Sequence, residues 1–410
     1  MENALEKLLH SPTSEKEKRG TLYTPLEIAR QTDLWPDTAR RVAAVLPELK
    51  TLIGSLSQKP HPLILLSGAG TSEFIGYCLD GLYRRQLRIP TGVFPSPLIV
   101  TNPEDVFVPE STPLLISFAR SGNSPESVGA YALANQFCPK IKHLVITCNR
   151  QGSLALQCGE NIEALCLTLD DRTNDHGLAM TASFSNMVIA GQGVSRTFDF
   201  EEFPLLVGRL VSAGKNLLLS CPDILEEICR MEFDRAVFLG NGANRGTAVE
   251  SHLKLQELTA GRVMCAWDTY LGLRHGPEAV IDKQTIVVAY LSSDPLTARY
   301  EQELMAELRV KRLGKTLIAV GASPGKEIQE LADVVCTFDP DNSLGIPDAF
   351  SPPVQVIVGQ LLGLFKSLAL GLKPDAPSEQ GTINRVVKGV KIYDSRAFRE
   401  QGLWQVTAES

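Results

Sequence analysis

The chain has 410 residues, of which 44% are hydrophobic and 21% charged, with a net charge of −7. A chain of this length and composition can form two globular domains, each with its own core. The negative net charge provides no basic field for nucleic acid, and no apolar run approaches the roughly 18 residues that cross a bilayer. We therefore expect neither a nucleic-acid partner nor a membrane partner.

The N-terminus and the cysteines favour a cytoplasmic location. The segment 1–15 lacks a basic region followed by an apolar run, so no secretory signal is expected there. The nine cysteines lie between Cys78 and Cys336, are odd in number and form no CxxC pair. Buried, reduced thiols in a cytoplasmic protein explain this pattern best.

Residues 1–58 are predicted to be helical. Thr24 is a candidate capping residue, followed by a proline and by Glu27, which together are typical of a capped helix start. Pro36 is predicted to interrupt this helix, because proline lacks the backbone N–H that a helix interior needs. Thr38 should then begin a second helix that runs to about Ser57.

Short apolar segments alternate with helical segments from residue 63 onward. The predicted strands are 63–67, 114–118, 143–147 and 162–169, and the predicted helices are 74–85 and 126–137. Continuous apolar strands separated by helices are typical of a parallel sheet that is covered on both faces.

The same series recurs in the second half, with predicted strands at 236–240, 286–290 and 316–320. Ser67 and Gly240 are 173 residues apart, as are Ser117 and Tyr290, which favours a duplicated unit over two unrelated Rossmann-like domains. The predicted fold is α/β, with two tandem domains that each hold a parallel sheet flanked by helices. We expect a helical segment 1–58, a first domain 59–210, a second domain 225–376 and a polar C-terminal tail 377–410.

Two serine-rich turns follow strand ends in the first half, at 68–73 and 117–127. Ligands of open parallel sheets bind beyond the carboxyl ends of the strands, where helix N-termini present backbone N–H groups to anions. We therefore predict a phosphate site, although simple helix capping by serine is an alternative. The candidate phosphate ligands are Ser72, Arg120, Ser121, Ser124 and Ser127, and Gly70 and Thr71 would border the substrate.

Neither turn matches a nucleotide-binding motif. The pattern GxxxxGK[ST] is absent, and the turn at 68–73 lacks the third glycine of GxGxxG. These departures count against a NAD-dependent dehydrogenase.

A charged stripe in the second half is the strongest catalytic candidate. Glu250, Lys254 and Glu257 fall on one face of a helix at i, i+4 and i+7. Such spacing usually indicates a solvent-facing row of salt bridges. Here, however, the helix follows a glycine turn at a strand end and precedes the sequence His275-Gly-Pro, which favours a functional role.

These segments resemble the sugar isomerase (SIS) domain family. The helix and the His275 turn are similar to the isomerase half of glucosamine-6-phosphate synthase, where E-x3-K-x2-E precedes K-H-G-P. The loop at 120–124 is similar to the S-x-S-G-x-T phosphate loop of that family. Ala119 stands at the first serine position, Arg274 replaces the usual lysine, and the interval between helix and turn is two residues longer.

The resemblance to the AgaS family is closer still. This family comprises galactosamine-6-phosphate deaminase/isomerases, formerly called tagatose-6-phosphate ketose/aldose isomerases. The matching segments are 68–76, 115–128, 177–184, 250–282 and 381–390, so that the resemblance extends from about residue 20 to about residue 395.

The resemblance implies roles for individual residues. Glu257 would move a proton between C2 and C1 of the sugar, and Lys254 would orient Glu257 or the C1 oxygen, although a purely structural Lys254–Glu257 pair is an alternative. His275 would open the sugar ring, with His176 as the second choice. Lys388 would hold ring oxygens or a developing oxyanion, or would simply anchor the tail at the surface.

Further contacts and partners are also implied. Thr181, Ser183 and Asn384 would line the sugar. In the synthase relative, the histidine that matches His275 comes from the neighbouring subunit. A homodimer with its active site near the interface is therefore expected. Neither a metal nor a cofactor is expected, because no pattern of metal ligands such as HxH or HxxxH occurs.

The implied substrate is a phosphorylated amino sugar. We expect conversion of galactosamine 6-phosphate to tagatose 6-phosphate and ammonia. A glucosamine-6-phosphate deaminase and a simple aldose–ketose isomerase use the same residues and remain alternatives. SIS domains also act as sugar-phosphate sensors in transcription regulators, but those normally lack the catalytic glutamate and carry a helix-turn-helix segment.

Overall fold

The computed structural model describes residues 2–378, 380–387 and 389–393, and within them it has two parallel five-stranded sheets. The first sheet has the strand order β2-β1-β3-β4-β5, and the second has β7-β6-β8-β9-β10. The two orders correspond strand by strand, which agrees with the predicted tandem α/β domains. The strands are β1 Pro62–Ser67, β2 Thr91–Val93, β3 Thr112–Ala119, β4 Lys142–Thr147, β5 Ala164–Thr168, β6 Arg235–Gly240, β7 Met264–Asp268, β8 Thr285–Tyr290, β9 Thr316–Gly321 and β10 Val334–Thr337.

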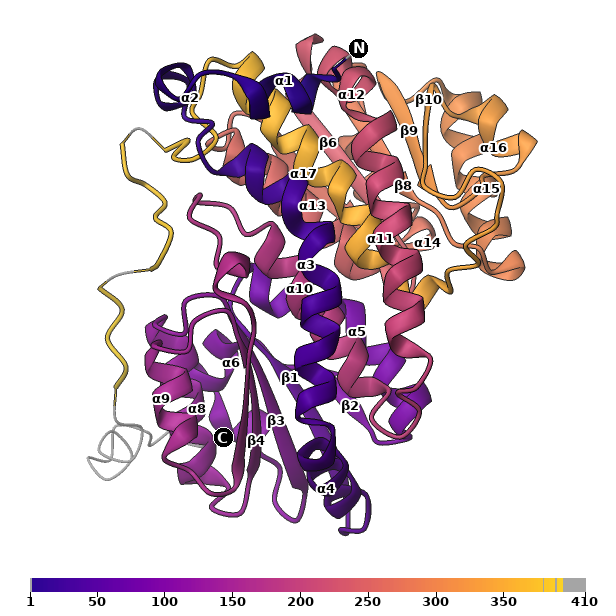
Figure 1. Ribbon diagram of the computed structural model, residues 1–410. Helices are drawn as coiled ribbons and strands as arrows, with labels where there is room; N and C mark the ends of the chain where they lie inside the picture. The colour runs from indigo at the N-terminus through magenta and orange to yellow at the C-terminus, as the bar shows by residue number, and fades with distance from the viewer. Residues whose placement is uncertain (1, 379, 388, 394–410) are drawn as a thin grey trace, which may run out of the picture.

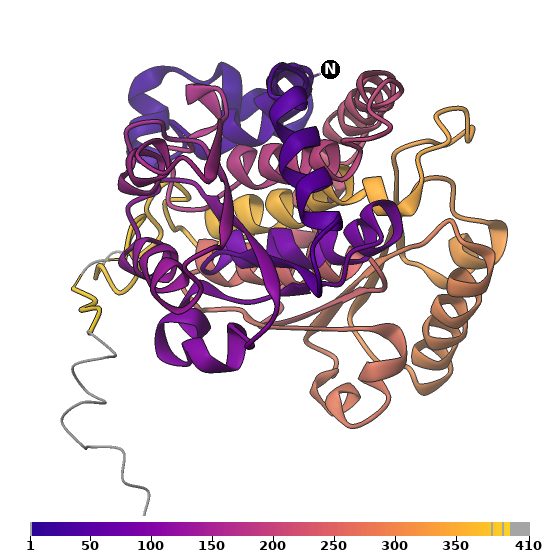
Figure 2. The same ribbon diagram turned by 90° about the horizontal axis from the view of Figure 1, so that it is seen from below.

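Long helices lie between the two sheets (Figures 1 and 2). Helices α3, α10 and α5 pack together beside the first sheet, while α11, α13 and α17 pack together beside the second. The α-helices are α1 Ala4–His10, α2 Thr13–Arg19, α3 Thr24–Ala44, α4 Leu46–Ser57, α5 Thr71–Leu87, α6 Ser96–Thr101, α7 Pro103–Val106, α8 Pro125–Phe137, α9 Ser153–Gly159, α10 Ala182–Ser195, α11 Phe203–Ser220, α12 Pro222–Arg230, α13 Asn244–Leu258, α14 Tyr270–Leu273, α15 Pro295–Lys311, α16 Lys326–Leu331 and α17 Pro352–Ala369. The short 3-10 helices are η1 Asp171–Thr173, η2 Pro277–Val280 and η3 Asp348–Phe350.

The predicted apolar strands are confirmed, and the reason is visible in the first of them. Ile64 and Leu66 of β1 point into the large core shared by the central helices, whereas Leu65 points to a smaller core beneath α6 and α8. Because both faces of the strand are covered, its positions from Pro62 to Leu66 are all apolar. The edge strands β2, β7 and β10 were not predicted, since they are short and their side chains are only partly buried.

The prediction that Pro36 interrupts the first long helix is wrong. Helix α3 continues through Pro36 and ends at Ala44. On either side of the proline, Trp35 Nε1 donates to Ser185 Oγ at 3.0 Å and Thr38 Oγ1 donates to Asn186 Oδ1 at 2.7 Å. These buried bonds to α10 hold the helix in place despite the missing backbone bond at Pro36.

The two halves meet through a close contact of α5 and α13. A methyl group added at Gly246 of α13 would lie 2.3 Å from Cys78 Sγ and 2.6 Å from Cys78 N on α5. On its other side α13 packs on α17, where a methyl group at Gly363 would lie 2.9 Å from Lys254 O. Helix α13, which carries the charged stripe, is therefore enclosed between one helix of each half.

The cysteines from Cys78 to Cys336 all lie in the described residues and none of them forms a disulfide there. Within the described ranges, no helix combines the length and apolar character needed to span a bilayer. Residue 210, where we expected the first domain to end, lies inside α11.

Gly246→Ala should destabilise the protein by about 1–3 kcal/mol, because the new methyl group meets backbone atoms of α5 that cannot rotate away. Thermal and urea unfolding measure this effect. The matched control is Gly208→Ala in α11, where a methyl group meets nothing within 4 Å. The control should leave stability unchanged or raise it by up to about 1 kcal/mol. Equal stability of the two variants would show that the α5–α13 contact is not tight.

Candidate active site

Two turns at the carboxyl ends of β1 and β3 form a polar cup. In the first, Gly70 has φ +56° directly before α5, and in the second, Gly122 has φ +67° shortly before α8. A methyl group at Gly68 would lie 2.4 Å from the backbone of Ser72, so the first turn closes only with glycine. Both turns open helices, and their N-terminal N–H groups and dipoles favour a bound anion.

The cup belongs to a cavity of about 400 Å³ that also receives the charged face of α13 and the C-terminal tail. Most of the predicted site residues lie around this cavity, although they come from segments that are far apart in sequence. The predicted residues that line it are Gly70, Thr71, Ser72, Arg120, Ser121, Ser124, Ser127, Lys254, Glu257 and Asn384.

The serine hydroxyls are not used for helix capping. Ser124 occupies the N-cap position of α8, but its side chain makes no capping hydrogen bond. Ser121 Oγ accepts a bond from Asn123 N at 3.3 Å, which still leaves its proton to donate. The capping alternative therefore does not explain the serines at 121 and 124.

Lys254 is the centre of a buried ion network. Its ammonium lies 2.7 Å from Glu257 Oε2 and 3.3 Å from Glu250 Oε1, and it donates to Thr71 Oγ1 at 3.0 Å. The side chains of Glu250 and Lys254 are 0% and 1% exposed. A solvent-facing row of salt bridges is thus excluded for these two residues, and the predicted common face of Glu250, Lys254 and Glu257 is confirmed.

Burial raises the pKa of Glu250, whereas the pKa of Lys254 depends on its carboxylate neighbours as well as on burial. Desolvation, only partly offset by Lys254, raises the pKa of Glu250 to about 8. For Lys254 burial alone would lower the pKa, but the carboxylates of Glu250 and Glu257 outweigh burial and raise it above its usual value. Lys254 consequently stays charged beside Glu257, while the Glu250 carboxyl tends to hold a proton at neutral pH.

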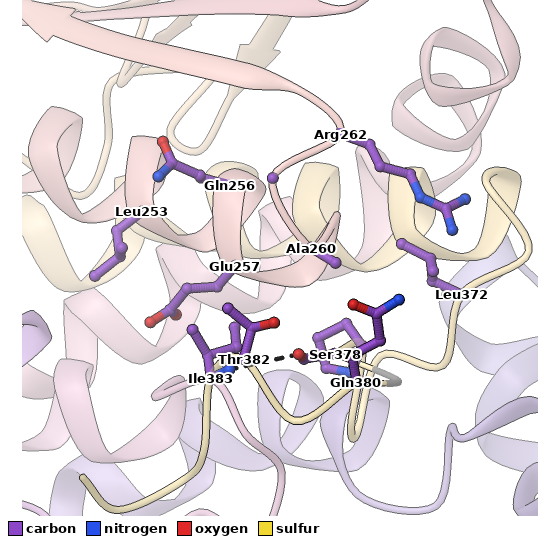
Figure 3. Close-up of a pocket in the computed structure, with 12 residues that line it drawn as sticks. Leu253, Gln256, Glu257, Ala260, Arg262, Leu372, Ser378, Gln380, Thr382 and Ile383 are labelled. Carbon is purple, nitrogen blue, oxygen red and sulfur yellow. Dashed lines mark hydrogen bonds between the residues drawn. The ribbon is translucent and has the colours of Figure 1, made fainter.

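Glu257 is accessible from the cavity, with a quarter of its side chain exposed. It also lines an adjoining cavity of about 490 Å³, and both cavities share Thr382 and Ile383 of the tail. Figure 3 shows the Glu257 side chain reaching from α13 toward these two tail residues. A carboxylate in this position can exchange protons with a molecule held in the cup.

Other predicted residues are placed differently. Thr181 and Ser183 do not line the cavity, because their hydroxyls donate to the carboxylate of Asp175 and they are fully buried. We therefore correct their expected contact with the sugar to a contact with Asp175.

His275 is exposed and lines neither of the two cavities, so a single chain does not bring it to Glu257. Lys388 lies outside the described residues.

Arg120 lines the cavity but its guanidinium is already engaged. It donates to the carbonyl oxygens of Gly177 at 3.4 Å, Leu178 at 3.0 Å and Arg385 at 2.5 Å. Desolvation and the nearby Arg385 lower its pKa from its usual value. The expected phosphate contact of Arg120 is thus secondary to its bonds with two backbone segments.

Several residues that line the cavity were not predicted from the sequence. Leu178 and Met180 form an apolar wall, and Arg385 adds a third cation to Arg120 and Lys254 at the cavity. Arg385 lies within the tail motif at 381–390, but nothing in the sequence indicated that it would meet the turn at 174–178. Among the described residues, no cluster of three or more His, Cys, Asp or Glu side chains could hold a metal ion.

Known proteins are similar to this chain in sequence and in structure. No profile of a known protein family matches the chain. It is 35% identical to D-galactosamine-6-phosphate deaminase AgaS of Escherichia coli over 378 residues, which cover 92% of this chain and 96% of that protein. A crystal structure from Clostridium novyi NT has a TM-score of 0.91 at 33% identity and covers 96% of this chain and 100% of that one. Tagatose-6-phosphate ketose/aldose isomerase from Escherichia coli has a TM-score of 0.82 at 33% identity and covers 91% of this chain and 96% of that one.

Glu250→Gln should reduce the pH dependence of stability. Because the pKa of Glu250 is about 8 in the folded chain against 4.5 for an ordinary glutamate, the folded state binds more protons between these values and loses stability as pH rises through them. Melting temperatures of the variant should therefore fall less between pH 5 and pH 8 than those of the wild type. Glu48→Gln, which changes an exposed carboxyl, should keep the wild-type slope. Parallel curves for Glu250→Gln and the wild type would contradict this account of Glu250.

Proposed function

This chain belongs to the AgaS family, and we propose that it converts galactosamine 6-phosphate and water to tagatose 6-phosphate and ammonia. The family and the tandem SIS fold expected from the sequence are confirmed by the AgaS relative and the solved structures. One observation carries the reaction: the carboxylate of Glu257 lies on the same cavity as both serine turns.

The cup suits a phosphate monoester. Ser72, Ser121, Ser124 and Ser127 surround it, and two helices begin there. Hydroxyl and backbone N–H donors at helix N-termini bind phosphate oxygens without any metal. With the phosphate held there, the other end of an extended six-carbon sugar would extend toward α13 and Glu257.

Glu257 supports the proton transfer. In the open-chain sugar, its carboxylate would remove the proton from C2. The electron pair of that C–H bond would form the C1–C2 double bond of an enolamine while the π pair of the C1 carbonyl moves onto O1, which takes a proton from water. The same carboxylate would return its proton to C1 as the nitrogen lone pair forms the C2–N double bond and an N–H proton passes to water, which leaves an imine at C2. The charged ammonium group of Lys254 lies 2.7 Å from Glu257 Oε2 and would orient that carboxylate.

Hydrolysis completes the reaction. Water adds to the imine carbon at C2, the C2–N bond breaks, and ammonia leaves the ketose phosphate. An aldose phosphate without the amino group would undergo the same proton transfer and stop at the ketose. Lys388 is proposed to hold sugar oxygens, as the family resemblance implies.

His275 requires a second subunit. It is exposed beside Leu271 and Val280, whose side chains are 44% and 39% exposed. In a single chain His275 lines neither of the cavities that Glu257 lines, so it can act there only from another copy of the chain. We therefore propose a homodimer in which His275 of the partner subunit completes the cavity and opens the sugar ring. The reduced cysteines favour a cytoplasmic enzyme.

In the substrate test, the purified protein is incubated with galactosamine 6-phosphate, glucosamine 6-phosphate or tagatose 6-phosphate, and ammonia and ketose are measured separately. We expect ammonia and ketose in equal amounts from galactosamine 6-phosphate, because imine hydrolysis releases both.

Glu257→Gln should lower kcat by at least about 100-fold, since positioned acid–base catalysis contributes a rate factor of about 10²–10⁴, while sugar-phosphate binding is largely retained.

The control for this test is Glu226→Gln on α12, which removes another carboxylate paired with a cation of its own helix. That variant should keep full activity. Ketose without ammonia would make the protein a plain isomerase, a larger rate with glucosamine 6-phosphate would change the substrate, and full activity of Glu257→Gln would remove the proposed base.

The phosphate cup is tested by the double variant Ser121→Ala and Ser124→Ala. Its KM for the phosphorylated sugar should rise at least about tenfold, because hydrogen bonds to charged groups are lost, whereas the melting temperature should change little. Ser212→Ala with Ser220→Ala, both on the exposed face of α11, is the matched control. An unchanged KM in the cup variant would place the phosphate elsewhere.

A further inference from the structure

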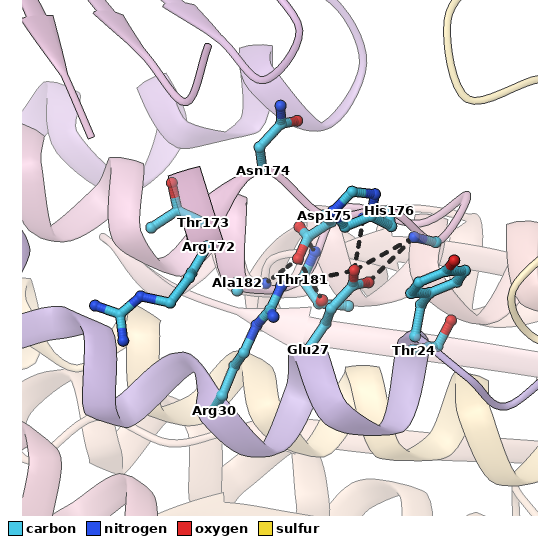
Figure 4. Close-up of polar contacts among 12 residues, drawn as sticks. Thr24, Glu27, Arg30, Arg172, Thr173, Asn174, Asp175, His176, Thr181 and Ala182 are labelled. Atoms are coloured by element: carbon cyan, nitrogen blue, oxygen red, sulfur yellow. Dashed lines mark hydrogen bonds and ion pairs between the residues drawn. The ribbon is translucent and has the colours of Figure 1, made fainter. Parts of the chain in front are cut away.

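The turn at 174–178, between η1 and α10, is held by a carboxyl from the N-terminal helix. Glu27 of α3 is 1% exposed, and its Oε1 accepts the backbone N–H groups of His176 at 2.5 Å and Gly177 at 3.4 Å. Its Oε2 lies 3.3 Å from the same Gly177 N–H. Figure 4 shows Glu27 pointing from α3 toward this turn. The N-cap position of α3 is Tyr23 and not the predicted Thr24, and Glu27 bonds to the turn.

The start of α3 is bound by Asp375, which follows α17 and precedes the tail, so that Glu27 is free to bond to the turn. Asp375 accepts the backbone N–H groups of Leu22 and Thr24, both at 2.7 Å. Its own carbonyl oxygen accepts the N–H of Leu178 at 3.0 Å. A methyl group at Gly177 would lie 3.0 Å from Glu27 Oε2, so the turn packs directly on the helix.

The opposite side of the same turn is held by the phosphate loop and the tail. Arg120 donates to the carbonyl oxygens of Gly177 and Leu178, and also to that of Arg385. Arg385 in turn donates from Nε to Asp175 O and from Nη2 to Asn174 Oδ1, both at 2.7 Å. The turn therefore connects the N-terminal helix, the phosphate loop and the tail segment 382–387 that lines the cavity.

We propose that Glu27 is a positioning residue of the active site, which holds the turn at 174–178 so that Arg120 and Arg385 can fasten the tail over the cavity. Glu27 is not among the residues that line the cavity, and it would act through the carbonyl oxygens that the turn presents to Arg120. Loss of the Glu27 contact should loosen Leu178 and the tail together, and weaken substrate binding more than the chemical step. The effect on catalysis rests on the proposed function, whereas the mechanical link does not.

The charge state of Glu27 decides which substitution is conservative. Desolvation and the neighbouring Asp175 raise its pKa to about 8, against the lowering effect of the His176 and Gly177 N–H groups and of Arg30. A protonated carboxyl is close in shape and hydrogen bonding to the amide of glutamine. Glu27→Gln therefore keeps an acceptor for the turn, while Glu27→Leu removes it.

The experiment compares Glu27→Leu, Glu27→Gln and the matched control Glu301→Leu. Glu301 is equally buried, with a pKa also raised to about 8 by burial, and accepts the Ser292 N–H at 2.8 Å in the second sheet, away from the cup. We expect Glu27→Leu to raise KM about tenfold and to change kcat less than about threefold, because one or two backbone hydrogen bonds are lost. Glu27→Gln and Glu301→Leu should stay within about twofold of the wild-type KM.

Hydrogen exchange measures the mechanical link without activity. In Glu27→Leu, the peptides covering 174–181 and 380–387 should both exchange faster, whereas Glu301→Leu should affect only its own surroundings. Unchanged exchange in the tail peptide, or an unchanged KM in Glu27→Leu, would overturn the proposal. An equal rise of KM in Glu301→Leu would reduce the effect to general destabilisation and also overturn it.

A second variant covers the case in which Glu27→Leu does not fold. Arg385→Ala removes the bonds from the tail to Asp175 and Asn174 and lies outside the core. Faster exchange at 174–178 and at 380–387 is expected, and unchanged exchange at 174–178 would contradict the link. If wild-type protein acts on none of the sugar phosphates, the proposed function fails, yet the exchange results still decide the role of Glu27.

Discussion

A buried ammonium group holds the two halves of this enzyme in register. Lys254 comes from the second half, and it donates to Thr71 of the first half while it pairs with Glu250 and Glu257 of its own helix. A buried charge is stable only when it is well paired, and removing a partner from such a group is strongly destabilising. The network therefore fixes where Glu257 lies relative to the serine turns.

The two sheets have corresponding strand orders, but only one carries the anion cup. In the second sheet, the turn after β8 has its donors occupied from within the chain, since Asp348 accepts bonds from Ser292 Oγ and from Ser293 N at 2.8 Å. At the first sheet, the residues that line the cavity include two carboxylates, Glu126 and Glu257, and among the described residues no hydrogen bond joins either of them to the serine turns. In the proposed reaction one half would supply the binding turns and the other would supply the base, so that both halves would be needed.

Much of the fold could be predicted from the sequence because both sheets are buried on two faces. Such strands are continuously apolar and stand out, as the segment around Leu65 does, whereas the three-residue strand β2 carries no comparable signal. The helix through Pro36 could not be predicted, because its continuity depends on bonds from Trp35 and Thr38 to a helix about 150 residues away in sequence. Local preference and distant contacts opposed each other there, and the distant contacts prevailed.

The sequence by itself determined the types of chemical group in the site: hydroxyls in glycine turns at strand ends, and a carboxylate and an ammonium group one helical turn apart. Those features depend on local backbone geometry, which neighbouring residues specify. Only the tertiary structure decided which groups meet. In the fold, Thr181 donates a hydrogen bond to Asp175 and Arg120 donates to backbone carbonyl oxygens. Glu27 accepts hydrogen bonds from a turn that lies far from it in sequence. Hydrogen-bond partners of buried groups depend on packing between distant segments, and no local pattern encodes that packing.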